Sequence, residues 1–313
     1  MEDILKQELD LSWIHFTGET GSGEICTGKA YNTNKGKIFV KHYERSTAMA
    51  MFEGECAGLQ TIGDTKIIKV PKYKKIVQLD DGSALLALEF LNMKPLEKHA
   101  KLMGQKLAEL HLLNAKKIAK MEKNESYVRK MDNTVVVQNF GFDTVTYNGH
   151  LRQTNTWCSD WLSFFVQQRL KPHIDELEIK YGHCEALSLW PIVERNIPKL
   201  FPKGLKITPS LLHGDLWYGN AGELENEPCV FDPIAFYGHS EYDLSMPHVF
   251  GGFSELFFDE YHRFLPKAQD FDKREKLYLL LLYLNHWNQL GPVHDGRQYR
   301  ENALKYMRYL ANL

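Results

Sequence analysis

Hydrophobic and polar residues follow an extended pattern up to about residue 90. The runs KIFVKHY, IVQL and ALLALEF are rich in apolar and β-branched residues, which favours strands, and Asp81-Gly82 is typical of a hairpin turn between the last two. One short helix is expected in STAMAMFEGECAGL, between the first run and the second. The pattern predicts a small β-rich lobe over residues 1–90.

After residue 90 the spacing of apolar residues becomes helical. In KLMGQKLAELHLLNAKK, one helical face holds Met103, Leu107 and Leu110. In REKLYLLLLYLNHW, the apolar face consists of Leu277, Leu280, Leu281, Leu284 and Trp287. Residues 116–132 are charged and have little apolar periodicity, so we expect a solvated helix end and a mobile loop there. The chain is therefore expected to be α+β, with a larger and mainly helical lobe over residues 91–313.

The composition argues for a globular chain and against two classes of partner. With 313 residues and 43% hydrophobic content, the chain can bury a substantial core. A formal net charge of -2 provides no basic field for nucleic acid or for an acidic membrane surface. The longest apolar run, Leu277 to Leu284, is far shorter than the roughly 20 residues of a membrane span. We expect neither nucleic acid nor a membrane as a partner.

The N-terminus and the cysteines indicate a cytoplasmic protein. The first residues, MEDILKQELD, are acidic and amphipathic, unlike a secretory signal or an Arg-rich transit peptide. Five cysteines would be mostly reduced in the cytosol. Their odd number and the lack of a C-x-x-C pair argue against a disulfide framework and a structural zinc site.

The strongest chemical signal is the segment LLHGDLWYGN, residues 211–220, followed by CVFDP. In kinase catalytic loops with the pattern H-x-D-x-x-x-x-N, the aspartate accepts the proton of the substrate hydroxyl. The asparagine and a later aspartate hold magnesium on the nucleotide phosphates. The matching residues here are Asp215, Asn220 and Asp232. The alternative is a turn rich in Gly, Asp and Asn that only serves backbone geometry.

Two departures from the protein-kinase pattern narrow the class. Gly214 stands where many protein kinases have an arginine that pairs with a phosphorylated activation loop, and Pro233 follows Asp232 in place of Phe-Gly. No A-P-E motif follows. The sequence indicates a kinase for a small acceptor, without an activation-loop switch.

Lys41 and Glu55 provide an independent test of this interpretation. Glu55 falls on the same helical face as Phe52, Cys56 and Leu59. A carboxylate on a buried face needs a cationic partner, because desolvating an unpaired charge costs several kcal/mol. Lys41, at the end of the strand KIFVK, is the candidate, and the pair would match the lysine and glutamate that position nucleotide phosphates in kinases. Two exposed side chains without contact are the alternative.

Two further segments could contact a nucleotide. The segment FTGETGSGEICTGKAY contains four glycines that would let backbone amides approach phosphate closely, although it is not a Walker loop and a flexible hairpin is the alternative. They are Gly18, Gly21, Gly23 and Gly28. At the change to helical composition, Leu88, Glu89 and Phe90 occupy the position of a kinase hinge, whose backbone would bind adenine. Glu89 is alternatively an ordinary edge-strand carboxylate.

Taken with these motifs, nearly the whole chain resembles the fructosamine-3-kinase (ketosamine-3-kinase) family, which is similar to aminoglycoside phosphotransferases within the two-lobed protein-kinase-like fold. The resemblance is carried by GKAYNTNKGKIFVK, MFEGECAGL, GQKLAELH, FGFDTVTYNGHLRQTN, DWLSFFVQQRL, LLHGDLWYGN, DPIAFYGHSEYDLSM, FGGF and YLNHW. HGDLW with YGHSE and FGGF is specific to that family. The resemblance implies an ATP- and Mg²⁺-dependent enzyme that phosphorylates the third-carbon hydroxyl of a sugar attached to an amine by glycation. The product would eliminate and free the amine, so that glycated lysines are repaired.

The resemblance also implies roles for individual residues. Asp215 would be the catalytic base, with Asn220 and Asp232 as magnesium ligands. Lys41 with Glu55 would position the phosphates of ATP. The hinge would comprise Leu88, Glu89 and Phe90, and the phosphate-binding strand would contribute Gly21 and Gly23.

Five residues are candidates for the acceptor pocket. Trp217 would stack on the sugar face, or else be a core tryptophan. His239 and Glu241 would shape the pocket, or instead brace the Asp232 loop. His286 and Trp287 lie on an apolar helix face, where a core histidine is the more frequent explanation.

Cys26 raises the question of redox control. Some family members have a cysteine in the phosphate-binding strand, where this chain has Glu24 and a cysteine two residues later. Strand alternation puts Glu24 and Cys26 on one face, so an exposed thiol is expected. We expect a monomer and keep a dimer linked through Cys26 as an open alternative.

Other functions on the same fold remain alternatives. An aminoglycoside, choline or homoserine kinase is one, and a nucleotide-binding pseudokinase is another. All expected catalytic side chains are present, which disfavours a pseudokinase. An antibiotic kinase would line its pocket with many carboxylates, whereas only a few, such as Glu241 and Asp243, follow Asp232. The sequence does not distinguish fructosamine from ribulosamine or psicosamine.

Overall fold

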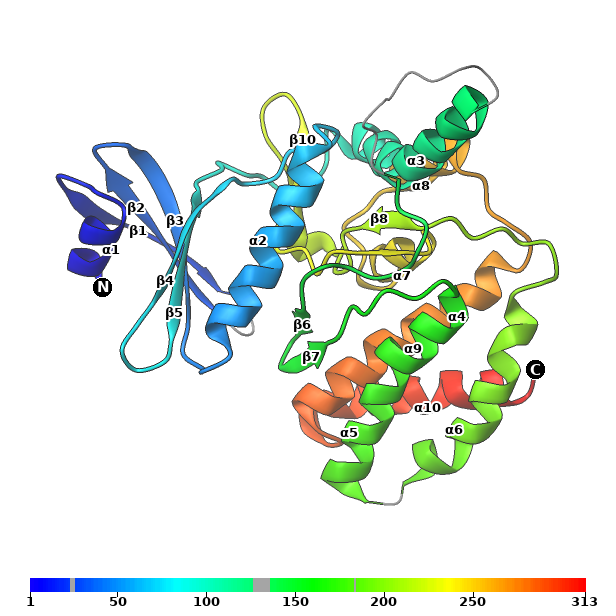
Figure 1. Ribbon diagram of the computed structural model, residues 1–313. Helices are drawn as coiled ribbons and strands as arrows, with labels where there is room; N and C mark the ends of the chain where they lie inside the picture. The colour runs from blue at the N-terminus through cyan, green and yellow to red at the C-terminus, as the bar shows by residue number, and fades with distance from the viewer. Residues whose placement is uncertain (23–25, 126–135, 183) are drawn as a thin grey trace.

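The molecule combines a small β-rich lobe with a larger, mainly helical lobe (Figure 1). The structure is a computed structural model and describes residues 1–22, 26–125, 136–182 and 184–313. The two lobes confirm the α+β, two-lobed architecture expected from the sequence. Within these ranges, none of the helices is long and apolar enough to cross a membrane.

The first lobe is an antiparallel sheet with the strand order β1-β2-β3-β5-β4. The strands are β1 (Ile14–Ser22), β2 (Thr27–Thr33), β3 (Gly36–Tyr43), β4 (Tyr73–Gln78) and β5 (Ala84–Glu89). Gly82, with a φ of 85°, forms the expected turn between β4 and β5. A short helix α1 (Glu2–Glu8) precedes the sheet.

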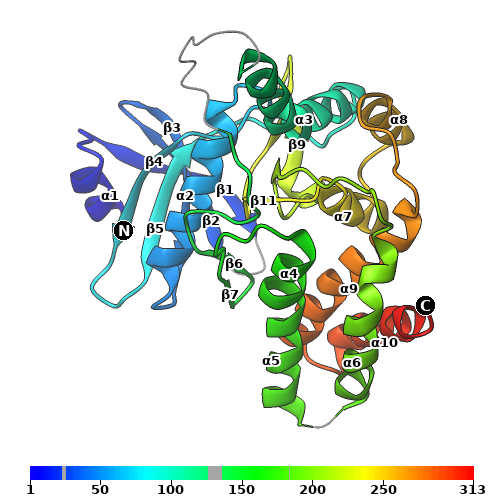
Figure 2. The same cartoon turned by 45° about the vertical axis from the view of Figure 1, so that its right-hand side comes forward.

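Helix α2 (Ala48–Asp64) lies between the sheet and the second lobe (Figure 2). It has 17 residues, so it is longer than the short helix that the sequence suggested. Its buried face holds Phe52, Cys56 and Leu59 together with Glu55, as the periodicity predicted. At Gly54 the helix meets the second lobe so closely that a Cβ there would lie 2.5 Å from the carbonyl oxygen of Val145.

The second lobe is built on two long helices whose apolar faces are buried. Both predicted apolar faces are confirmed, since their residues are all buried in α3 (Ala100–Glu125) and α9 (Phe271–Leu290). None of residues 116–123 is buried, which fits the predicted solvated helix end, and the loop expected to follow falls on residues 126–135, outside the described ranges. The remaining helices are α4 (Trp161–Phe165), α5 (Lys171–Tyr181), α6 (Glu185–Asn196), α7 (Tyr242–Phe250), α8 (Glu255–Phe264) and α10 (Arg297–Ala311).

The described part of the second lobe also contains short strand pairs. They are β6 (Thr146–Asn148) with β7 (Leu151–Gln153), β8 (Ser210–Leu212) with β11 (Phe236–Gly238), and β9 (Ala221–Glu223) with β10 (Pro228–Val230). The loop from β8 to β9 contains Asp215 and Asn220, and the loop from β10 to β11 contains Asp232. Because β8 pairs with β11 and β9 with β10, the two loops are brought side by side.

Candidate active site

Two adjoining cavities lie where the lobes meet. The first, which we call the inner cleft, has a volume of about 240 Å³ and is lined from α2, the β6–β7 hairpin, α7 and α9. The second, the sheet cavity, has a volume of about 520 Å³ and lies against β1, β2, β3 and β5. Both are lined by Cys26, Lys41, Trp217, Asn220 and Asp232. The motif residues therefore stand at the junction of two cavities.

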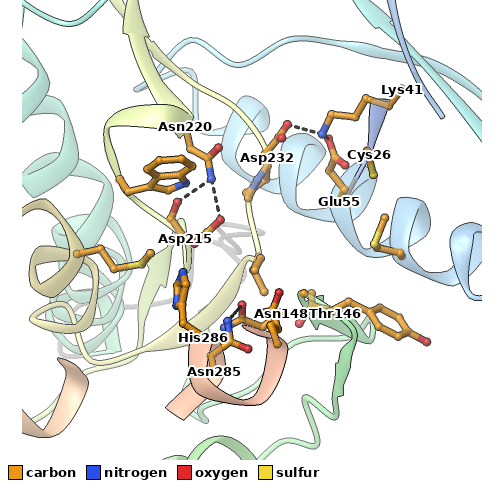
Figure 3. A pocket seen from close by; sticks show the side chains of 18 of the residues that line it. Cys26, Lys41, Glu55, Thr146, Asn148, Asp215, Asn220, Asp232, Asn285 and His286 are labelled. Atoms are coloured by element: carbon orange, nitrogen blue, oxygen red, sulfur yellow. Dashed lines mark hydrogen bonds and ion pairs between the residues drawn. The ribbon is translucent and has the colours of Figure 1, made fainter. Parts of the chain in front are cut away.

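Lys41 connects the two carboxylates that the sequence assigned to the nucleotide side. Its Nζ donates to Glu55 Oε1 at 2.8 Å and to Asp232 Oδ1 (Figure 3). Burial alone would lower the pKa of Lys41, but the charges of Asp232 and Glu55 outweigh it and raise that pKa above its ordinary value. Burial also raises the pKa of Glu55, against the opposing effect of Lys41. Lys41 therefore stays charged, and the predicted buried pair with Glu55 is present.

Asn220 and Asp215 form the second part of the site. The Asn220 Nδ2 donates to Asp215 Oδ2 at 2.7 Å and to the Asp215 backbone oxygen at 3.0 Å (Figure 3). Because Nδ2 is engaged by Asp215, the side-chain oxygen of Asn220 is the atom that could bind a ligand between Asn220 and Asp232. Asp232 itself has a φ of 55°, an uncommon conformation for a residue with a side chain, and such backbone strain is concentrated at functional sites.

The loop that carries Asp215 is held from behind by Asp243. The carboxylate of Asp243, which is 2% exposed, accepts hydrogen bonds from the backbone N–H groups of His213 at 2.7 Å and Gly214 at 2.8 Å. It also lies 3.2 Å from His111 Nε2. Sequence reasoning noted Asp243 only as one of few carboxylates, because nothing local marks a partner 29 residues away. The loop position is thus fixed by charge-assisted hydrogen bonds.

His213 and Gly214 have structural reasons for their identity. Burial lowers the pKa of His213, so the ring is neutral and donates Nε2–H to the Phe231 carbonyl at 2.9 Å. Gly214 has a φ of 83°, and a Cβ there would lie 2.1 Å from the Ile234 carbonyl oxygen. The glycine that replaces the arginine of protein kinases is therefore required by this close approach.

The expected hinge lines the sheet cavity. Leu88, Glu89 and Phe90 all face it. The carboxylate of Glu89 is engaged by Lys69 Nζ at 2.9 Å and by the Lys72 backbone N–H at 3.1 Å. The backbone N–H of Glu89 donates to the Lys72 carbonyl at 2.7 Å, so neither this group nor the side chain is left for a purine, and adenine binding by the hinge stays a prediction.

The glycines of the first strands pack on an aromatic ring. A Cβ at Gly28 would lie 2.2 Å from the Phe39 Cζ, and one at Gly21 would lie 3.0 Å from it. Both glycines also line the sheet cavity. Close packing on Phe39 is what the structure shows of their role, and contact with phosphate stays a prediction. Gly23 lies outside the described residues.

Cys26 lies inside the site. It is half-buried and lines both cavities beside Lys41. Burial raises the pKa of its thiol to about 12. Cys26 is therefore a protonated, half-buried thiol within the cleft and not the exposed thiol that strand alternation predicted. Glu24, which was expected on the same strand face, lies outside the described residues.

Two of the five predicted acceptor residues line the inner cleft. Trp217 is half-buried, with its ring 6.0 Å from that of Phe250. His286 stacks on Tyr299 with ring centroids 4.5 Å apart. Trp217 is thus not a core tryptophan, and both side chains line the cleft, where His286 Nδ1 lies 2.9 Å from the Leu282 carbonyl oxygen.

The other three predicted acceptor residues lie elsewhere, which corrects their placement. His239 and Glu241 line a separate cavity behind the catalytic loop. Glu241 accepts two hydrogen bonds from Arg274, each of 2.7 Å, and His239 Nδ1 lies 2.6 Å from the Tyr278 hydroxyl. Trp287 is 3% exposed and lies in the core. His239 and Glu241 are thus bound by buried side chains of α9, and Trp287 packs in the core, so none of the three lines the inner cleft.

The structure adds polar residues that sequence reasoning missed. The inner cleft is also lined by Thr146, Asn148, Asn285 and Gln289. Asn285 Nδ2 donates to Asn148 Oδ1 at 2.7 Å, across 137 residues of sequence. The polar residues within the apolar segment YLNHWNQ were the sequence signal that could have identified Asn285 and Gln289. Thr146 and Asn148 had no such signal, because the three-residue strands of the hairpin are too short to show a periodicity.

The fold and the site together define a kinase-like phosphotransferase. A strand lysine paired with a helix glutamate, and an Asp, Asn and Asp on two adjoining loops, are the parts that phosphoryl transfer from ATP requires. Comparison with known protein families narrows this class to one family. The model of the fructosamine kinase family matches residues 2–312, and the chain belongs to that family.

Curated relatives agree with this family, and solved structures share the fold. The chain is 44% identical to the ketosamine-3-kinase of Mus musculus over 99% of this chain and 100% of that protein. It is 35% identical to the chloroplastic protein-ribulosamine 3-kinase of Arabidopsis thaliana, over 94% and 83%. A crystal structure of a candidate fructosamine-3-kinase from Haemophilus somnus 129PT has a TM-score of 0.77 at 23% identity, covering 99% and 96%. The crystal structure of aminoglycoside phosphotransferase APH(4)-Ia has a TM-score of 0.58 at 13% sequence identity. The match covers 99% of this chain and 97% of that chain. At these identities the two structures show the shared fold.

Proposed function

We propose that this protein is an ATP-dependent ketosamine 3-kinase. It transfers the terminal phosphoryl group of ATP to the third-carbon hydroxyl of ribulosamine or fructosamine adducts on glycated lysines. The observation that carries the proposal is the position of Asp215, which lines the inner cleft and is held by Asn220 at the junction with the sheet cavity. The identity of 44% to the mouse ketosamine-3-kinase over the full chain supports this acceptor class.

ATP fits the sheet cavity in this proposal. The backbone of residues 88–90 would hold adenine, and Lys41 would turn from Asp232 to the phosphates while Glu55 keeps it in place. Gly21 and the undescribed Gly23 would belong to the strand that covers the phosphates.

Magnesium is the second cofactor of the proposal. The side-chain oxygens of Asn220 and Asp232 are hard donors of the kind Mg²⁺ prefers, and Asn220 already spends its N–H on Asp215. These two residues would hold the ion, which supplies neutralisation of the phosphate charge.

Asp215 acts on the acceptor. Its carboxylate would take the proton of the third-carbon hydroxyl as the oxygen attacks phosphorus, and Trp217 would cover the sugar face. The resulting 3-phosphate eliminates inorganic phosphate, and water then hydrolyses the remaining imine, which releases the lysine amine and a deoxy-dicarbonyl sugar. The sugar therefore leaves the protein without direct cleavage of its bond to nitrogen by an enzyme side chain.

The remaining parts of the proposal concern organisation. Residues 1–90 serve as the nucleotide-binding lobe and residues 91–313 as the catalytic and acceptor-binding lobe. We propose a cytoplasmic monomer. A dimer linked through Cys26 is disfavoured by the position of the thiol within the cleft and by its raised pKa.

The experiment uses the purified chain with ATP and glycated lysozyme. Mass spectrometry should show an added phosphate followed by loss of the sugar, and phosphorus NMR of a small ketosamine should place the phosphate on the third carbon. Kanamycin and choline serve as competing acceptors, and Asp215→Asn as the inactive control. Phosphorylation of kanamycin or choline without any ketosamine turnover would refute the proposal.

A further inference from the structure

Three carboxamide side chains form one wall of the inner cleft. Asn148 ends β6, and Asn285 and Gln289 lie one turn apart on α9, so the latter two share a helical face. All three line the same cleft as Asp215. In Figure 3, Asn148 and Asn285 lie together on the side of the cleft away from Lys41. We call Asn148, Asn285 and Gln289 the amide wall.

The amide wall is fixed by contacts between the hairpin and α9. Asn285 Nδ2 donates to Asn148 Oδ1 at 2.7 Å. Gly149, with a φ of 64°, packs directly on Gln289, since a Cβ there would lie 2.2 Å from the Gln289 Nε2. These contacts therefore join the hairpin to α9 along the wall.

One atom of the wall lacks a hydrogen-bond partner. Asn285 is 3% exposed, and its Oδ1 is buried without a partner among the described residues. Buried polar atoms are nearly always paired, so an orphaned acceptor in a cleft calls for a ligand or another explanation. The oxygen is covered from solvent here, so an acceptor hydroxyl reaches it only when the Asn285 side chain or the atoms that cover it move.

The charged groups of the cleft favour a sugar over a polyamine as the acceptor. Among the described residues that line it, the carboxylates are Glu55, Asp215 and Asp232, and the first and last are bonded to Lys41. A polyamine would need several free carboxylates. A carboxamide both donates and accepts hydrogen bonds without charge, as a sugar hydroxyl does.

We infer that the amide wall is the sugar-recognition subsite of this enzyme. Asn285 Oδ1 accepts a hydrogen bond from an acceptor hydroxyl other than the one that reacts at Asp215, and Asn148 orients the Asn285 carboxamide. The wall thereby selects a polyhydroxylated acceptor over a polyamine and fixes which hydroxyl meets Asp215. This inference rests on the proposed function, because it concerns the same acceptor.

The test compares Asn285→Ala with a matched control on the same helix. Asn288 is 5% exposed, and its Oδ1 is likewise unpartnered within the described ranges, but its Nδ2 donates to the His173 carbonyl, away from the cleft. Asn285→Ala should raise the ketosamine KM by roughly tenfold, as loss of one hydrogen bond implies, with the ATP KM unchanged. Asn288→Ala should leave both KM values near wild type.

Deoxy acceptors distinguish sugar contact from a purely structural role. Wild type and Asn285→Ala are each assayed with a ketosamine and its 4-deoxy and 5-deoxy forms. For the form that lacks the contacted hydroxyl, the two enzymes should have nearly equal kcat/KM, because the interaction is already gone. Asn148→Ala, which removes the orienting partner, should give the same pattern and serves if Asn285→Ala does not fold.

Three results would overturn the inference. One is an unchanged ketosamine KM in both wall variants, and another is an equal loss for Asn288→Ala. The third is a loss in Asn285→Ala that has the same size with every deoxy acceptor, which would make the residue a hairpin anchor only. In each case the wild type still phosphorylates ketosamine, whereas failure of the proposed function would appear as a wild type inactive on every ketosamine.

Discussion

Removing Lys41 should affect stability and catalysis in different ways. Lys41→Met would leave the carboxylates of Glu55 and Asp232 facing each other, with side-chain exposures of 9% and 36%. Breaking a buried ion pair from one side costs about 3–5 kcal/mol, because the remaining charge is buried without a partner. At about 2–4 °C per kcal/mol, Tm should fall by about 6–20 °C.

Adding Glu55→Gln to Lys41→Met should restore part of this loss, since one of the two unpaired charges is removed. Activity should not return, because the lysine that positions the phosphates is still absent, and the double variant should be little worse in kcat/KM than either single variant. The second substitution should therefore raise Tm without raising kcat/KM.

The pH dependence of Lys41→Met follows from Glu55. Burial raises the pKa of Glu55 to about 7 from an ordinary value of 4.5, and losing Lys41, which lowers it, raises it further. The folded state then binds this proton more tightly than the unfolded state. Stability is therefore lost as the pH rises from the unfolded pKa through the folded one. The Tm of Lys41→Met should be closer to wild type at about pH 5.5 than at about pH 8.

Thermal unfolding by circular dichroism and steady-state kinetics measure these effects. The control is Lys35→Met with Asp10→Asn, an exposed pair joined at 3.2 Å, for which changes within about 1 kcal/mol are expected. A double variant less stable than Lys41→Met, or losses in kcat/KM that multiply, would refute the coupled buried pair.

Three further outcomes are expected. Asp215→Asn should lower kcat by about 10² to 10⁴ while calorimetry still detects ATP binding; more than half of wild-type kcat would remove Asp215 from the mechanism. Gly214→Ala should destabilise the chain by more than about 2 kcal/mol in denaturant unfolding, because its Cβ would lie 2.1 Å from the Ile234 carbonyl oxygen. Gly204→Ala, at a φ of 98° without a clash, should cost only about 1 kcal/mol, and equal losses would contradict the steric argument. Trp217→Ala should raise the ketosamine KM by roughly tenfold and the ATP KM by much less; the reverse pattern in initial-rate kinetics would place Trp217 on the nucleotide side.

The site residues that could be predicted are those with a strong local pattern. Glu55 was identified because an acid on an apolar helical face demands a cation, and Lys41 is indeed 2.8 Å away. Asp215, Asn220 and Asp232 are fixed by spacing within a motif, and the short strand pairs bring their loops together.

Residues whose role depends on long-range packing could not be placed. His239 and Glu241 follow Asp232 closely in sequence, yet they point away from the cleft because Tyr278 and Arg274 bind them. Asn148 and Asn285 meet across 137 residues, and no local periodicity specifies that encounter. Motif spacing therefore locates the reacting centre, whereas the acceptor side requires the tertiary fold.

The contact at Gly54 links the two halves of the reaction. Helix α2 holds Glu55 on the nucleotide side, and at Gly54 it abuts Val145, next to the hairpin that presents Asn148. A shift of α2 on ATP binding would have to carry the hairpin along or break this contact. Thermodynamic reciprocity then requires that whatever factor ATP applies to the affinity for the sugar, the sugar applies equally to the affinity for ATP. One backbone approach, possible only without a side chain, thus makes the coupling between the affinities for the two substrates a measurable property of this helix.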